Sequence, residues 1–217
     1  MIKTLLLAAS LAVTAFSAQA ATMKAVFTNV VSEFYDGPTL GGSALAVGDI
    51  IHTTYTYNTN DPSRTTNSLI DRLTSPSAFL SVSVEFKGWT YSFSPNDSAL
   101  MEVFSGTPQL FQANALGLDN VGPETHAINL HNDLQTSVHY PANLEAPVTV
   151  FGDLYSPFSF DIRTNDATTG ERNGVYGEGY VQSVTISAVP LPASLPLLMA
   201  GFGGLAALRR KKKPVIA

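Results

Sequence analysis

Three of the four histidines lie close together in the chain, and imidazole nitrogen is the commonest metal ligand in proteins. They are His126, His131 and His139. Helical zinc hydrolases place two histidines four residues apart, with a glutamate between them, so that both rings share one face. No such motif occurs, and on a strand His131 and His139 cannot converge without a turn. We interpret these residues as ordinary surface or half-buried histidines and expect no metal and no cofactor.

Hydrolytic chemistry has candidate residues but no motif. Glu85, Glu102 and Glu178 carry the carboxylates that a glycosidase pair needs, yet each also fits the solvent-facing position of an alternating strand. A serine hydrolase needs a Gly-x-Ser-x-Gly elbow, which is absent. The absence of cysteine excludes thiol catalysis and cysteine-ligated metal centres. We expect a non-enzymatic protein, with a secreted hydrolase as one alternative.

A calcium-binding module is another alternative, because side-chain oxygens gather in two turn-like segments. These segments contain Asn58, Asn60 and Asp61, and Asp161, Asn165 and Asp166. No calcium-loop motif is present, and such residues also hydrogen-bond the local backbone of ordinary turns. We interpret both segments as solvated turns.

A carbohydrate-binding module would use aromatic rings for stacking. The candidates are Trp89, Tyr91, Tyr55, Tyr57 and Tyr140. Aromatic residues that alternate along strands most often fill the core between sheets. We therefore interpret them as core residues and keep sugar binding as the alternative.

The elements that would position these residues are β-strands, because apolar and polar residues alternate with a period of two. Residues 80–86 and 89–93 alternate on either side of Lys87 and Gly88, which predicts a hairpin. A β-branched and aromatic strand is predicted at residues 51–57. Further strands are expected at residues 24–31, 100–104, 127–130, 136–140, 148–154, 157–163 and 180–188.

Glycine and proline recur at intervals that leave room for strands and little room for helices. The patterns predict an all-β fold, an antiparallel two-sheet sandwich of jelly-roll-like form. Residues 60–77 are predicted to form a long loop with one helical turn at residues 68–73. The glycine-rich residues 170–179 are predicted to form a loop that leads into the last strand.

Charge is distributed unevenly along the chain. All 17 Asp and Glu lie in residues 21–188, together with six of the 12 Lys and Arg, so this body has a formal charge of −11. Such a surface repels phosphate backbones, and we expect no nucleic-acid partner.

The first twenty residues have the pattern of a secretory signal peptide. A short positive start precedes an apolar run at residues 5–16, and the small side chains of Ala18 and Ala20 fit the usual cleavage rule. We predict a signal peptide at residues 1–20 and one mature body at residues 21–188, a length typical of a single domain.

Residues 189–217 combine a motif, an apolar run at residues 195–208 and a basic cluster, in that order. The motif is Val189, Pro190, Leu191, Pro192 and Ala193, and the cluster is Arg209, Arg210, Lys211, Lys212 and Lys213. The uncharged stretch can be buried in lipid as a transmembrane helix. Five consecutive cations stay cytoplasmic as a stop-transfer signal, because their desolvation would cost much free energy.

This tail resembles the PEP-CTERM class of bacterial protein-sorting signals, in its Val-Pro-Leu-Pro-Ala variant, over residues 189–213. The resemblance implies recognition by an exosortase, a membrane-embedded cysteine transpeptidase, and cleavage near the motif. It also implies an envelope or surface protein of a Gram-negative bacterium, with exopolysaccharide as a candidate partner.

We therefore expect a non-enzymatic, exported and exosortase-sorted protein of the cell surface or extracellular matrix. Its precursor would be anchored in the inner membrane through the tail, with the body facing the periplasm. Signal peptidase, the translocon and the exosortase would be its partners during export.

Overall fold

The chain separates into two units, residues 1–20 with 189–217 and residues 21–188. The computed structural model describes residues 22–35, 37, 39–105, 110–121, 124–135, 143–152, 156–166 and 172–189. Among them, every regular element is a β-strand apart from one 3-10 turn, η1 (Pro76–Ala78). The prediction of an all-β body is confirmed.

Fourteen strands are present in the described residues. In chain order they are β1 (Thr22–Tyr35), β2 (Thr39–Leu40), β3 (Ser43–Ala44), β4 (Ile50–Asn58), β5 (Thr65–Thr66), β6 (Ile70–Leu73), β7 (Phe79–Phe86), β8 (Trp89–Phe93), β9 (Ser98–Phe104), β10 (Leu110–Val121), β11 (Glu124–Gln135), β12 (Val148–Phe151), β13 (Pro157–Asp166) and β14 (Arg172–Ala188).

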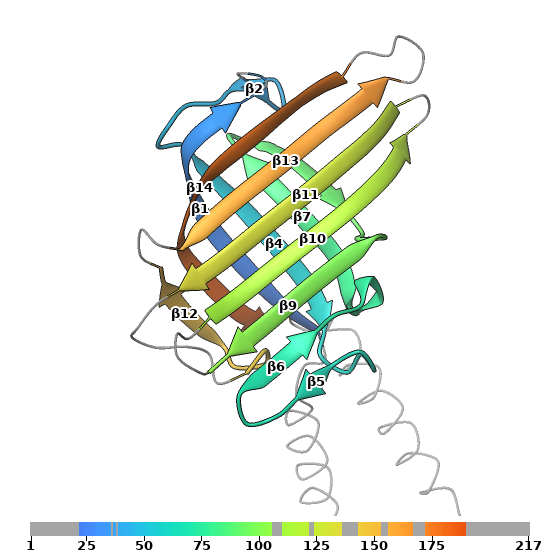
Figure 1. Cartoon of the computed structure of the whole chain (residues 1–217), viewed down its shortest axis with the longest axis vertical. Helices are drawn as coiled ribbons and strands as arrows, with labels where there is room; N and C mark the ends of the chain where they lie inside the picture. Colours follow the sequence, from blue (N-terminus) through green and yellow to red (C-terminus); the bar gives the residue numbers. More distant parts are fainter. Residues whose placement is uncertain are drawn as a thin grey trace, which may run out of the picture. The chain divides into compact units, whose positions relative to one another are not determined.

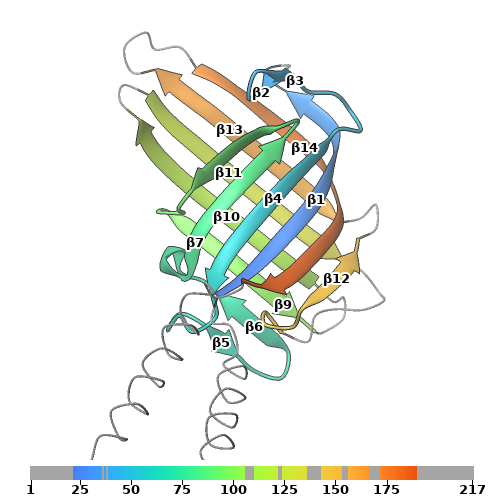
Figure 2. The same cartoon turned by 180° about the vertical axis from the view of Figure 1, so that it is seen from behind.

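Twelve of these strands form one antiparallel sheet in the order β5-β6-β9-β10-β11-β13-β14-β1-β4-β7-β8, and β12 pairs with β14 beside this path. The sheet is curled, so that β13, β11, β10 and β9 form a near layer in Figure 1 and β1, β4 and β7 lie behind them. Figure 2 shows β4 and β1 from the other side. Where the sequence predicts two separate sheets, the layers are two halves of one sheet, joined where β14 pairs with both β13 and β1.

The interior is filled by the inward-facing residues of both halves. Along β4, Ile51, Tyr55 and Tyr57 are buried and alternate with half-buried residues, as the period of two predicts. Phe27 of β1 stacks on Phe111 of β10, with ring centroids 5.4 Å apart and planes 10° apart. Because β1 and β10 belong to different halves, this aromatic contact holds the two layers together.

The predicted hairpin is confirmed. Phe86 of β7 pairs with Trp89 of β8, and Lys87 and Gly88 form the two-residue turn with φ of 45° and 85°. Two successive positive φ angles belong to the turn type whose twist matches that of antiparallel strands. Only the second turn position is occupied by glycine, so Lys87 adopts a conformation that side chains generally disfavour.

The predicted helical turn at residues 68–73 is wrong, because β6 occupies residues 70–73. The predicted loop at residues 60–77 is also interrupted by β5 and ends in η1. Ile70 and Leu73 pair with Phe104 and Met101 of β9, and Asp71 and Leu73 are buried. The burial of every second residue satisfies the period of a strand and leaves no helical face.

The predicted loop at residues 170–179 is also wrong over its described part, since β14 begins at Arg172. A Cβ on Gly179 would lie 1.9 Å from the Val30 carbonyl oxygen, and one on Gly177 would lie 2.4 Å from the Phe160 ring. The glycines therefore allow close approach of neighbouring strands.

Candidate functional site

Most of the predicted sorting residues lie outside the described residues. These are Ala18, Ala20, Pro190, Leu191, Pro192, Ala193, Arg209, Arg210, Lys211, Lys212 and Lys213. Val189 is described, and it follows β14 directly. No helix in the described part of the chain is long and apolar enough to cross a membrane.

The strand that follows the predicted leader and the strand that precedes the sorting motif are neighbours in the sheet. β1 begins at Thr22 and β14 ends at Ala188, and Met23 lies opposite Ala188 in the antiparallel ladder. Figure 2 shows β1 and β14 side by side. The predicted leader, which ends at residue 20, and the sorting motif, which begins at Val189, therefore join the body at the same end, within three residues of the Met23–Ala188 pair.

The histidines do not assemble into a metal site in the described residues. His131 Nε2 lies 3.1 Å from Asp133 Oδ2, and His52 Nδ1 lies 3.4 Å from Thr28 Oγ1 on the neighbouring strand. His126 belongs to β11, and His139 lies outside the described residues. No group of three or more metal-binding side chains is present among the described residues.

The three candidate glutamates lie on strands that are not neighbours, β7, β9 and β14. Glu102 forms an ion pair with Arg72, and Glu178 accepts a hydrogen bond from the Tyr176 hydroxyl. Glu85 is exposed and lies opposite His52 in the β4–β7 ladder. Glu85 and Glu178 are exposed, as the alternation predicts, whereas Glu102 is buried, so the solvent-facing interpretation is wrong for Glu102. The described contacts bring no two of these carboxylates together.

Side-chain oxygens at the turn after β4 accept local hydrogen bonds from the backbone. Asn58 Oδ1 accepts from the Asn60 amide at 3.0 Å, and Asp61 Oδ1 accepts from the Ser63 amide at 2.9 Å. Hydrogen bonds from Ser63 lower the pKa of Asp61. In the second segment, Asp161 forms an ion pair with Arg163. The first segment is thus a hydrogen-bonded turn. Asp161, Asn165 and Asp166 all belong to strand β13, so the prediction of a turn in the second segment is wrong.

Two of the candidate stacking aromatics are buried and hydrogen-bonded. Tyr55 and Tyr57 have no exposed area, and their hydroxyls donate to the carbonyl oxygens of Ala113 and Leu144 at 3.3 and 2.7 Å. Burial raises the pKa of both phenols. Trp89 and Tyr91 are half-buried and stacked along β8, and Tyr140 lies outside the described residues. The interpretation of Tyr55 and Tyr57 as core is confirmed.

A polar network crosses the interior and was not predicted. Asn29 Nδ2 donates to Thr53 Oγ1 at 3.1 Å, and Thr53 Oγ1 donates to Asn132 Oδ1 at 2.9 Å. Asn132 Nδ2 then donates to the Tyr55 hydroxyl at 2.7 Å. Asn29, Thr53 and Asn132 have no exposed area. The network joins β1 and β4 to β11, so it fixes the two halves of the sheet relative to each other.

A charged cluster near β6 was also missed. Arg64 donates to both carboxylate oxygens of Asp71 at 2.8 Å, and it forms a second ion pair with Glu145. Asp71 Oδ2 also accepts from the Leu144 amide at 2.8 Å. The hydrogen bonds that Arg64 donates to Asp71 and Glu145 raise its pKa despite partial burial. This cluster fixes the segment before β12 against β6.

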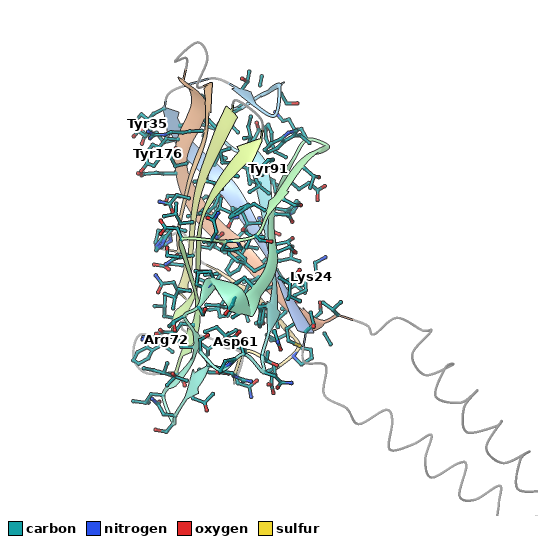
Figure 3. The ribbon with its side chains drawn as sticks, turned by 90° about the vertical axis from the view of Figure 1, so that its right-hand side faces the viewer. Lys24, Tyr35, Asp61, Arg72, Tyr91 and Tyr176 are labelled. Carbon is teal, nitrogen blue, oxygen red and sulfur yellow. The ribbon has the colours of Figure 1, made fainter. Side chains whose placement is uncertain are left out.

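The outer face of the β1–β14 pair carries two tyrosines that no sequence motif marks. Tyr35 and Tyr176 are cross-strand partners whose rings stack with centroids 5.7 Å apart and planes 23° apart. Figure 3 shows both side chains together on the outer side of the strands.

Comparisons with known proteins identify no family for this chain. No family model matches this chain, and neither a curated protein nor a solved structure matches it.

Proposed function

We propose that this protein is exported through its leader and presented to an exosortase through its tail, and that its β-sandwich-like body functions at the cell surface or in the extracellular matrix without catalysis. The observation that carries the proposal is the order of the Val-Pro-Leu-Pro-Ala motif, the apolar run and the basic cluster immediately after the last strand.

The pairing of the body's two ends supports this proposal. With Met23 opposite Ala188, a leader and a tail that are both held by a membrane would tether the body at one end. If the first and last residues of the body lay at opposite ends of the sheet, a long connection would be needed for the membrane to hold both the leader and the tail. Signal peptidase, the translocon, the exosortase and the membrane are the proposed partners, with exopolysaccharide as a candidate partner at the surface.

The motif begins directly after Ala188, so only five residues separate the end of β14 from the end of the motif. Five residues span at most about 18 Å when fully extended. A membrane-embedded enzyme that acts near the motif therefore works close to the folded body. The exposed end of the sheet, rather than a flexible linker, would set how the enzyme approaches.

Intact mass spectrometry of the protein isolated from its native cells tests the proposal. The expected mass corresponds to loss of residues 1–20 and of the segment that follows the motif. Replacing Arg209 to Lys213 by serine should release the tail from the membrane. In the control variant, serine replaces Thr65, Thr66 and nearby exposed residues of the body, five positions in all. This control should be processed like the parent protein. A secreted product that still carries Arg209 to Lys213 would overturn the proposal.

Membrane orientation gives a second readout. A reporter fused after Ala217 should lie in the cytoplasm, because the basic cluster resists translocation. An extracytoplasmic reporter would contradict the proposed topology even if the tail were cleaved.

A further inference from the structure

Tyr35, which is exposed, and Tyr176, which is half-buried, form part of a negatively charged patch. Tyr35 is 44% exposed, which makes it one of the more exposed large aromatic side chains of the body. Its ring and that of Tyr176 stand together on the outer face, at the paired positions of β1 and β14 (Figure 3). Cross-strand aromatic pairs stabilise a sheet, but that role does not require exposed rings.

Each tyrosine is coupled to a carboxylate on its own strand. The Tyr176 hydroxyl donates to Glu178, and the Tyr35 hydroxyl forms a side-chain hydrogen bond with Glu33. Donation to Glu33 raises the pKa of Tyr35 to about 12, and donation to Glu178 raises that of Tyr176. Both phenols are therefore neutral donors at physiological pH, and both rings lie beside a full negative charge.

No cation neutralises these two carboxylates among the described residues. Glu33 and Glu178 are exposed and make no ion pair there, although Glu33 lies opposite Glu178 in the ladder. The nearby Arg163 is paired with Asp161, at 2.6 Å. Two like charges on opposite positions of adjacent strands repel each other, so the patch would gain stability from a positively charged ligand.

We propose that Tyr35, Tyr176, Glu33 and Glu178 form a binding site for a linear polyamine, with one ammonium group against the tyrosine rings and the carboxylates. Aromatic faces attract ammonium groups through the ring quadrupole. The carboxylates add direct charge attraction, and the body's formal charge of −11 draws cations toward the surface. A neutral sugar would use only the rings, and an anion would be repelled. This ligand goes beyond the proposed sorting function and does not depend on it.

Titration calorimetry of purified full-length protein with spermidine at low ionic strength tests the site. We expect Tyr176→Leu and Tyr35→Leu each to weaken binding about two- to fivefold, the range for an exposed cation–aromatic contact. The double Tyr→Phe variant keeps both rings and should bind within about twofold of the parent. The double variant Glu33→Gln with Glu178→Gln should weaken binding about tenfold.

Glu85→Gln is the matched control, because Glu85 is an exposed carboxylate on β7, a strand that is not adjacent to the patch. It should leave spermidine binding unchanged. Equal loss in this control, or no effect of the Tyr→Leu variants, would show that spermidine acts only as a counterion and would overturn the site. Binding of a neutral cello-oligosaccharide with the same sensitivity to Tyr→Leu would overturn the ligand class. Neither result bears on tail processing, which mass spectrometry reads separately.

Discussion

Thr53 Oγ1 lies 2.9 Å from Asn132 Oδ1 in the interior, and its hydrogen bond joins β4 to β11 across the space between the two halves of the sheet. The Thr53 hydroxyl is both donor and acceptor, because it also receives the Asn29 amide. The direction of every hydrogen bond from Asn29 to the Ala113 carbonyl follows from this arrangement. The network ends at Asn29 Oδ1, which has no partner among the described residues.

Thr53→Val should lower the free energy of unfolding by about 2 kcal/mol, because it leaves Asn132 Oδ1 and Asn29 Nδ2 buried without a partner. Urea denaturation followed by circular dichroism would measure the change. Thr54→Val is the control, since Thr54 is on the opposite face of the same strand and only half-buried. Equal stability of the two variants would mean that the interior network contributes nothing.

Arg64→Met should cost about 3 kcal/mol, because it leaves the Asp71 carboxylate, 6% exposed, without its bidentate partner. Arg163→Met removes an ion pair with Asp161 in which the arginine is 46% exposed, and it should cost no more than about 1 kcal/mol. Thermal unfolding of both variants gives the comparison. The prediction fails if Arg163→Met is the more damaging substitution.

Gly179→Ala should destabilise the body by about 3 kcal/mol, because the new methyl group would overlap the Val30 carbonyl of β1. Gly42→Ala has open space around it and meets only the strain of a φ of +78°, so it should cost about 1 kcal/mol. Denaturant midpoints would separate a steric from a conformational cost. Similar values for the two variants would argue against close approach of β1 and β14.

Stability should decline above a pH of about 10. Burial raises the pKa of Tyr55 and Tyr57 above the unfolded value of about 10. A raised pKa stabilises the fold fully below the unfolded value, and this contribution is lost as the pH rises through the folded values. Ultraviolet difference absorbance should show these two phenols ionising together with unfolding. Ionisation of all eight tyrosines in the native protein would contradict this result.

Much of the fold follows from local alternation, but a strand whose inward-facing residues are small cannot be recognised in this way. The hairpin at β7 and β8 is predictable because large apolar residues alternate on both sides of Lys87 and Gly88. β10 was missed because its inward positions include Ala113, Ala115 and Gly117, which are too small to give a hydrophobic signal. Gly117 is small because the Phe93 ring lies where its Cβ would be.

The polar contacts could not be predicted, because their partners are distant in sequence. Thr53 and Asn132 are 79 residues apart, and Arg64 and Glu145 are 81 residues apart. A single sequence carries no signal for such pairs. The alternation of Tyr176 with Val175 and Gly177 could have marked Tyr176 as outward-facing, but its stacking on Tyr35 depends on the pairing of β14 with β1.

That pairing also dictates when the sheet can be completed. β1 is made first, yet one of its two neighbours is β14, the last strand of the body. A nascent chain that lacks β14 therefore leaves one edge of β1 without backbone partners, and such non-local closure is slow. The final seventeen-residue strand therefore completes the sheet. A body truncated before it has unpaired backbone groups along one edge of β1, from Met23 to Tyr35.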